Sequence, residues 1–244
     1  MTKNFKLSKM VRGLYFRLFS ILIFSFLFLV INQSNAKTEP EFLISWRALN
    51  YVPADYQGKI FPTKATQIEV AFDLIDKNKL VDLSKNKIAW YLNNNFLQSG
   101  VGLKTIAFKV PVNLNQTVRV AISGYKEDTL EKIFLLPVKN PEATLSIKTP
   151  AGKILRNRPH LSPTNYLFEA RPFFFNVSEL KNLKFNWRIN DKYLTNESTN
   201  PEFFNLNLQS DGPTQETELG ISVGINNLLN QLEIASKLIN FIVK

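Results

Sequence analysis

The chain of 244 residues is 45% hydrophobic, which supplies enough apolar material for two small cores and excludes wholesale disorder. It has no cysteine, so disulfides, thiolate catalysis and cysteine-ligated metals are excluded, and its single histidine argues against a histidine-based triad or metal site. The formal net charge is +10, but five positive charges and no acid lie in residues 1–17, which leaves +5 for the rest. No nucleic-acid-binding motif accompanies this charge, so we expect no nucleic-acid partner and no cofactor.

Residues 1–36 have the features of a secretion signal. The basic flank ends at Arg17, residues 18–31 are apolar apart from serine, and small residues precede a cleavage point before Lys37. The apolar run of 14 residues is shorter than the roughly 20 that a membrane-spanning helix needs. The pattern favours a cleaved signal; the alternative is an uncleaved anchor, through which alone the chain would contact the membrane. Both alternatives predict an extracytoplasmic protein, whether secreted, periplasmic or at the cell surface.

The segment after the signal combines one strand with an irregular loop. Residues 42–46 alternate as in a strand, and the stretch that follows contains Pro53, Gly58 and Pro62, which exclude a long helix or a central strand. Three aromatic residues here are candidate binding residues: Trp46, Tyr51 and Tyr56. They either form an exposed platform for a sugar or a peptide, or cover the bottom of the first domain; we favour the second interpretation.

One stretch of the sequence occurs twice. Asp82–Leu97 reads DLSKNKIAWYLNNNFL, and Glu179–Leu194, 97 positions later, reads ELKNLKFNWRINDKYL. Apolar residues alternate around Trp90 in the first copy and around Trp187 in the second, which places them on one face of a β-strand. A strand with a central inward tryptophan, repeated at a domain-sized interval, predicts two copies of one β-domain in tandem. We expect both tryptophans to be buried.

The strands of the first domain, residues 37–139, are predicted from alternating apolar residues separated by turn signals. They lie at 68–72, 88–92, 106–110, 118–122 and 133–138. Residues 73–82 are expected to form a polar connection, and residues 99–102 a turn. The Asn140–Pro141 break, which has no flexible glycine/serine linker, marks the predicted domain boundary.

The second domain, residues 140–244, repeats this order. Its strands are predicted at 143–148, 166–170, 173–177, 185–189, 204–208 and 219–225. The tail from residue 226 is ambiguous, because its leucine spacing permits a helical turn or two, whereas residues 238–243 take the place of a closing strand. Helical periodicity is scarce throughout, so the predicted fold class is all-β, with two tandem immunoglobulin-like antiparallel β-sandwiches.

The two halves resemble tandem immunoglobulin-like or PKD-like β-sandwich domains of the disulfide-free kind found on bacterial surface proteins. The resemblance rests on Trp90 and Trp187, on the alternating strands around them and on a period close to the roughly 100 residues of such a domain. The segment Trp46–Lys59, W-x-A-x-x-Y-x-P-x-x-Y-x-G-K, also resembles the opening of secreted proteins from small-genome bacteria. The resemblance spans residues 41–244 and implies architecture rather than activity. Both core cysteines of antibody-type domains are missing.

No set of residues in the sequence stands out as an active site. Four residues are close enough in sequence to be calcium ligands: Asp73, Asp76, Asn78 and Asp82. They lack the glycine turn and the closing glutamate of an EF-hand loop, and lysines interrupt them, so we expect a solvated connection and no metal. Carboxylate pairs for glycoside hydrolysis show no distinguishing pattern, and the nucleophile-elbow motif is missing. The chain is therefore predicted not to be an enzyme.

Phe174 is the fourth candidate binding residue. In a strand its ring would point away from those of Phe173 and Phe175, so it either contacts a partner or, as we favour, is buried at the junction between the domains. The sequence thus predicts a non-enzymatic structural or adhesive module of the cell envelope. It would bind an envelope or surface protein through loops or a sheet edge such as 238–243. The alternative is a carbohydrate-binding module that takes up a glycan with the aromatic residues of 46–56.

Overall fold

The computed structural model describes residues 39–112, 114–126, 128–149, 152–154, 159–162, 164–194, 199–208 and 216–243. The predicted signal, residues 1–36, lies outside this part of the chain. The described residues divide into a small compact unit, 39–41 with 76–79, and a larger unit that holds all the others. Within the described ranges, no helix has both the length and the apolar character needed to cross a membrane.

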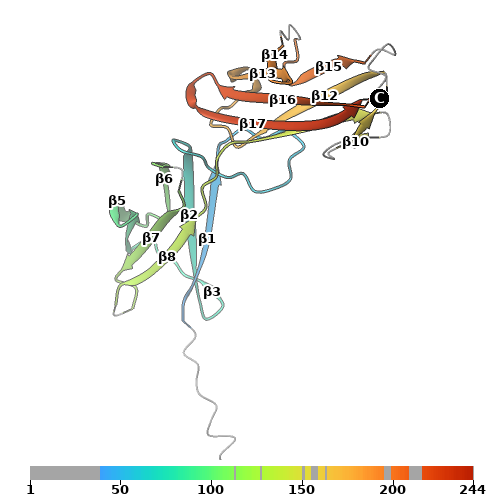
Figure 1. Cartoon of the computed structure of the whole chain (residues 1–244). Helices are drawn as coiled ribbons and strands as arrows, with labels where there is room; N and C mark the ends of the chain where they lie inside the picture. Colours follow the sequence, from blue (N-terminus) through green and yellow to red (C-terminus); the bar gives the residue numbers. More distant parts are fainter. Residues whose placement is uncertain are drawn as a thin grey trace, which may run out of the picture. The chain divides into compact units, whose positions relative to one another are not determined.

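The first hydrophobic core lies between two sheets (Figure 1). One sheet has the order β1-β2-β3, with β6 also paired to β2, and consists of β1 (Glu41–Ala48), β2 (Gln67–Asp76), β3 (Lys79–Leu80) and β6 (Thr105–Lys109). The other has the order β5-β4-β7-β8 and consists of β4 (Lys87–Leu92), β5 (Asn95–Val101), β7 (Gln116–Ser123) and β8 (Leu130–Leu136). Inward side chains of the two sheets meet in the core, where the ring centroids of Phe72 and Trp90 are 5.5 Å apart.

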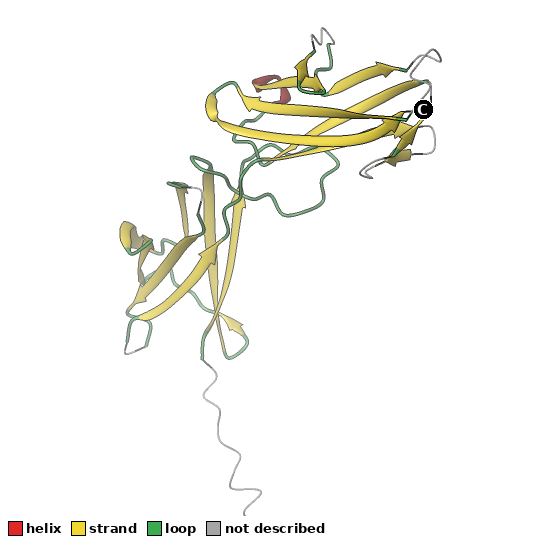
Figure 2. Ribbon diagram, in the orientation of Figure 1, coloured by secondary structure: helices red, strands yellow, loops and turns green. Residues whose placement is uncertain are grey.

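The second core lies between two further sheets, and strands dominate here too (Figure 2). The sheet β10-β9-β12-β15 consists of β9 (Glu142–Thr149), β10 (Gly152–Ile154), β12 (Asn165–Phe173) and β15 (Phe203–Asn207). The sheet β11-β17-β16-β13-β14 consists of β11 (His160–Leu161), β13 (Leu183–Ile189), β14 (Lys192–Tyr193), β16 (Thr217–Asn227) and β17 (Asn230–Val243). A 3-10 turn, η1 (Leu180–Asn182), precedes β13. Trp187 stacks on Phe204 in this core, with ring centroids 5.4 Å apart.

The two halves of the described chain share one strand order. The sheet β5-β4-β7-β8 corresponds to β14-β13-β16-β17, and β1-β2-β6 corresponds to β9-β12-β15. Both tryptophans of the repeated stretch are fully buried. The indole N–H of Trp90 donates to Leu103 O at 2.9 Å, and that of Trp187 donates to Pro201 O, also at 2.9 Å. The all-β class and the burial of both tryptophans are confirmed, whereas the domain boundary at Asn140–Pro141 stays a prediction.

The repeated stretch ends in the same hairpin in both copies. Asn93 and the residue after it link β4 to β5 with φ values of 49° and 66°, as the central residues of a type I′ turn require. Asn190 and its successor link β13 to β14 with φ values of 44° and 63°. Oδ1 of Asn93 accepts the Thr117 N–H at 2.9 Å, and Oδ1 of Asn190 accepts the Gly220 N–H at 2.8 Å. The aligned asparagines therefore tie each hairpin to the next strand of its sheet.

Two local predictions for the first half are wrong. Residues 73–82 are not only a polar connection between strands, because β2 continues to Asp76 and a two-residue turn leads into β3. Both turn residues have positive φ, 49° and 61°, the geometry of a tight hairpin. Residues 99–102 are not simply a turn, because β5 pairs with β4 as far as Val101.

Two predictions for the second half also differ from the structure. The strand predicted at 173–177 does not form, because β12 ends at Phe173 and Phe174 has a φ of 63°, outside the range of a strand. The helical alternative for the tail is wrong, because β17 runs from Asn230 to Val243 and pairs with β16. Strand pairing prevails over the local leucine spacing, since Ala235, Ile239, Phe241 and Val243 all enter the second core.

Candidate functional site

The segment between β1 and β2 carries most of the candidate binding residues. Residues 49–66 form no strand, and their backbone contacts the end of β12 through an isolated antiparallel bridge. The Tyr51 N–H donates to Phe175 O at 2.7 Å, and the Phe174 N–H donates to Tyr51 O at 2.8 Å. This bridge places the proline-containing loop against the residues that follow β12.

A buried polar network begins next to the bridge. Asn50 is only 5% exposed, and its Nδ2 donates to Thr63 Oγ1 at 3.0 Å and to Phe174 O at 2.6 Å. Thr63, also buried, donates from its hydroxyl to Glu233 Oε1 at 2.8 Å. The loop 49–66 is thus hydrogen-bonded to β17 by side chains 170 positions apart in the sequence.

Glu233 is the centre of this network. Its side chain is 4% exposed, and besides Thr63 it accepts the Asn176 N–H at 3.0 and 3.1 Å and Nδ2 of Asn227 at 2.5 Å. All three donors are neutral groups, so the carboxylate is held by hydrogen bonds rather than by a cation. A buried carboxylate needs such partners because an unpaired buried charge is strongly unfavourable. The network joins the loop, the turn after β12 and the β16–β17 hairpin.

A hollow of ≈ 330 Å³ lies beside Tyr51, and its wall includes Asp55, Arg171, Glu202 and Phe203. The Arg171 guanidinium forms an ion pair with the Asp55 carboxylate. Burial raises the pKa of the Tyr51 phenol above its usual 10.0, and Glu202 raises it further, while Arg171 acts in the opposite direction. The phenol therefore stays neutral at physiological pH and can donate a hydrogen bond.

Trp46 and Tyr56 are half-buried against other side chains. Nζ of Lys59 lies 4.0 Å from the centroid of the Trp46 ring and donates to Trp46 O at 2.5 Å, and the Phe61 ring lies 6.1 Å away. The Tyr56 ring meets Phe173 edge-on at 5.5 Å, and its hydroxyl donates to Lys59 O at 3.1 Å. Each ring is engaged by its own protein neighbours, an arrangement that does not favour a flat sugar platform.

Phe174 is 5% exposed and packs inside the protein. Its ring makes T-shaped contacts with Tyr56 at 5.9 Å and with Phe61 at 5.6 Å. A positive φ in a bulky residue costs on the order of 1–3 kcal/mol, so the surrounding contacts must hold it there. The structure brings Phe174 together with Tyr56 through their rings and with Tyr51 through the backbone, whereas Trp46 contacts Phe61 and Lys59. A binding role for these four residues stays a prediction.

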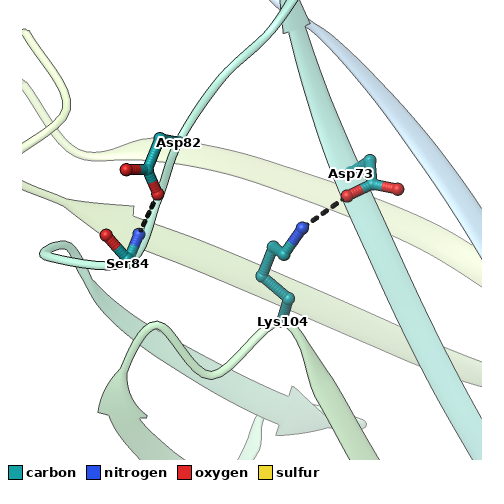
Figure 3. A network of polar contacts seen from close by, with 4 residues as sticks. All are labelled: Asp73, Asp82, Ser84 and Lys104. Atoms are coloured by element: carbon teal, nitrogen blue, oxygen red, sulfur yellow. Dashed lines mark hydrogen bonds and ion pairs between the residues drawn. The ribbon is translucent and has the colours of Figure 1, made fainter.

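Figure 3 shows Asp73 and Asp82, two of the acidic residues considered as calcium ligands. Asp73 forms an ion pair with Nζ of Lys104 at 2.6 Å, and Oδ1 of Asp82 accepts the Ser84 N–H at 2.9 Å. The hydrogen bond from Ser84 lowers the pKa of the Asp82 carboxyl below its usual value. Within the described part of the chain, no group of three or more His, Cys, Asp or Glu side chains is placed to hold a metal ion. The Asp73 carboxylate is paired with Lys104, and the Asp82 carboxylate accepts a hydrogen bond within a turn.

An exposed apolar surface covers the β16–β17 hairpin and the outer face of β17. We call this the β17 surface; it consists of Leu228, Leu229, Leu232, Ile234 and Leu238, which are 51–88% exposed. Glu233, Ala235 and Ile239, which alternate with them along β17, are buried, whereas Lys237 at the same parity is exposed. Leu238 lies opposite Ser222 of β16, and a Cβ added at Gly220 would come within 3.3 Å of its side chain. The small residues of β16 leave the outer face of Leu238 uncovered.

β17 also lies at the edge of its sheet over most of its length. In the order β11-β17-β16-β13-β14, β11 pairs in parallel with only Ile242 and Val243. From Asn230 to Phe241, no strand among the described residues pairs with the outer side of β17. The edge predicted at 238–243 is therefore covered at its end. The part without a pairing strand extends toward the hairpin, where residues 63–65 and 140–141 line a hollow of ≈ 230 Å³ together with Leu232, Glu233 and Ile234.

Sequence reasoning missed Glu233, Arg171 and the β17 surface. A signal for the surface was present in the tail, but its leucines were also compatible with a helical turn. With a strand period, Leu232, Ile234 and Leu238 fall on one face. No such signal exists for Glu233, because its donors come from three separate segments of the chain.

No protein-family model matches the chain, and no curated protein matches it. The fibronectin(III)-like modules of Clostridium thermocellum CbhA are a similar solved structure, with 10% identity and a TM-score of 0.30 over 82% of this chain and 93% of that chain. A second is SGBP-B of the Bacteroides ovatus mixed-linkage glucan utilization locus in complex with a mixed-linkage heptasaccharide, with 12% identity and a TM-score of 0.24 over 83% of this chain. The match spans 47% of SGBP-B. At these TM-scores neither likeness bears on the site.

Proposed function

We propose that this chain is a non-catalytic, extracytoplasmic protein-binding module that docks an extended strand of a partner protein onto β17. The observation that carries the proposal is that the β17 surface coincides with a strand edge that is unpaired among the described residues. An edge strand offers backbone N–H and C=O groups to an added strand. The exposed leucine and isoleucine side chains lose apolar area to water when the added strand covers them.

The size of the apolar surface is consistent with reversible docking. Complete burial of a leucine or isoleucine side chain contributes about 1.5–3 kcal/mol. Leu232, Ile234 and Leu238 are already partly covered, so they offer on the order of 3–5 kcal/mol together. Backbone pairing has to supply the rest of the free energy, since association also costs translational and rotational freedom.

The cellular role in this proposal comes from the sequence. The signal pattern of residues 1–36 supports an extracytoplasmic location, and a binding module without chemistry of its own fits a structural or adhesive role in the cell envelope. A glycan ligand is the alternative. It needs a flat exposed row of Trp46, Tyr51 and Tyr56, and the neighbours of those rings do not favour such a row. Strand docking is the function that the geometry supports better.

Site-specific photocrosslinking of the full chain in its native host tests this proposal. A photoreactive amino acid is placed singly at Leu232 or Leu238, and we expect protein adducts from both positions after illumination. Ile133 and Leu135 are matched controls, because they are 58% and 60% exposed on β8, which is also an edge strand. The same adducts from the β8 positions, or none from β17, would contradict the proposal.

A further inference from the structure

We infer that the strand docked on β17 is β17 of a second copy of this chain. The inference rests on the proposed function and names the partner. The two strands run antiparallel around a two-fold axis at Ala235, so that one surface serves both copies, as in an isologous dimer. The direction of the backbone groups, the positions of the apolar side chains and the charges on β17 carry the inference.

The backbone groups of the even-numbered residues of β17 face its open edge. The Ile242 N–H donates to Pro159 O at 3.0 Å, and therefore points away from β16. Since the register with β16 is regular from Ile234 to Val243, every second residue repeats this direction. The N–H and C=O of Ile234 and Ser236 are thus directed outward. In the proposed register Ile234 of each copy lies opposite Ser236 of the other copy. The two pairs allow four backbone hydrogen bonds.

The same register also pairs the apolar side chains. Leu232, the most exposed of them at 88%, lies opposite Leu238 of the second copy. Side chains directly opposite each other on antiparallel strands are about 4.5–5.5 Å apart at Cβ and contact one another. Two symmetric leucine pairs form in this way, one on either side of the axis.

The charges of β17 favour its own copy over an arbitrary strand. Lys237 occupies a position whose neighbours, Ala235 and Ile239, point into the core, yet it is exposed. A lysine placed in this way on an edge strand opposes the addition of another strand. No acidic residue in the described part of the chain forms an ion pair with Lys237. A docked strand therefore has to bring an anion to the position opposite Lys237.

The second copy provides that anion. With the axis at Ala235, Lys237 lies directly opposite Glu233 of the other copy, and the relation occurs twice. The Glu233 carboxylate is 4% exposed and held by neutral donors alone, so the lysine ammonium of the second copy would act on it as a countercharge from the edge of the network. Opposite charges that face each other across strands stabilise the pairing and select the register.

Disulfide crosslinking of the full chain tests both the partner and the register, because the natural chain has no cysteine. In the proposed register the two copies of residue 235 form a non-hydrogen-bonded pair, with Cα atoms about 4.5 Å apart, within the range of a disulfide. The two copies of residue 236 are about 8–9 Å apart at Cα, beyond that range. Mild oxidation should therefore give a covalent dimer of the Ala235→Cys variant and at least tenfold less of the matched Ser236→Cys variant.

Each outcome decides part of the inference. Crosslinking of Ser236→Cys in preference to Ala235→Cys overturns the register and the Glu233–Lys237 pairing. Crosslinking of neither variant, with a monomer in analytical ultracentrifugation of the unmodified chain, overturns the second copy as partner. Photocrosslinks from Leu232 to a different protein would in that case still support the proposed function. No photocrosslinks at all would contradict both the proposed function and the second copy as partner.

Two further variants separate pairing from folding. Lys237→Glu faces Glu233 of the second copy with a like charge, and should raise the dimer dissociation constant by roughly tenfold or more. Lys132→Glu on the β8 edge is its matched control and should leave that constant unchanged. Ser236→Pro removes an N–H that faces the open edge but none that pairs with β16, so it should abolish the dimer while the far-ultraviolet circular dichroism stays native. An unchanged dissociation constant in both Lys237→Glu and Ser236→Pro overturns the inference.

Discussion

Replacing Glu233 by leucine removes the carboxylate at the centre of the buried network while keeping a side chain of similar size. Three neutral donors then lose their acceptor: the Thr63 hydroxyl, the Asn176 N–H and the Asn227 amide. Thr63 can redirect its hydroxyl to Thr66 Oγ1 at 3.1 Å, so its loss is small. The Asn227 amide remains buried with only a long hydrogen bond to Asn176 O at 3.5 Å, and the partly buried Asn176 N–H has no other acceptor among the described residues.

The expected cost follows from these two groups. A buried donor left without a partner costs about 1–3 kcal/mol, which gives about 2–6 kcal/mol for Asn176 and Asn227 together. Removing the buried Glu233 carboxylate offsets part of this loss, because the folded state no longer has to desolvate a charge. We therefore expect the free energy of unfolding to fall by about 3 kcal/mol, which corresponds to a decrease in melting temperature of about 6–12 °C in a chain of this size. Glu233→Gln keeps one acceptor oxygen and should cost about half as much.

Urea denaturation followed by tryptophan fluorescence and by circular dichroism measures the change, and both probes are needed because two cores can unfold separately. The control is Glu69→Leu, which removes an exposed strand glutamate whose ion pair with Arg47 is solvated on both sides. A surface pair of this kind contributes at most about 1 kcal/mol. If Glu233→Leu is no less stable than Glu69→Leu, the network does not hold the loop to β17 and the reasoning fails.

Other predictions concern the core, the hollow and the repeated hairpin. Trp187→Ala should lower the free energy of unfolding by about 3–5 kcal/mol in denaturant titrations, as should Trp90→Ala; near-native melting temperatures in both variants would refute the sandwich cores. Because the pKa of Tyr51 is raised in the folded state, the protein should lose stability as the pH rises from 10.0 through that pKa, and Tyr51→Phe should lose less over the same range in urea titrations at stepped pH. Asn94→Gly should stabilise the protein by about 0.5–1 kcal/mol, because glycine adopts the φ of 66° at this position without strain. Asn93→Gly should instead destabilise it by about 1 kcal/mol, because the side-chain hydrogen bonds of Asn93 are lost. Equal effects of the two variants in thermal melts would contradict the turn assignment.

The positions where sequence reasoning failed share a physical cause. Residues 73–82 and 99–102 were predicted as connections because polar residues and glycine weaken the apolar alternation, yet their backbone groups are paired within strands or hairpins. The end of β12 could not be predicted either, since the positive φ of Phe174 is held by contacts with the distant loop 49–66. Local preference was overridden by pairing and packing in all three places.

The sequence by itself determined the all-β class, the repeat and the burial of Trp90 and Trp187, because alternation at a period of two is a local property that survives in any sandwich. Only the tertiary structure decided which strand is left at an edge, since that depends on the neighbours each strand acquires in its sheet. It also decided the partners of Glu233, which come from segments as far as 170 positions away. The candidate binding surface was also decided by the tertiary structure. Its leucines are visible in the sequence, but their exposure has two tertiary causes. The residues of β16 beside them are small, and no strand among the described residues pairs with the outer side of β17.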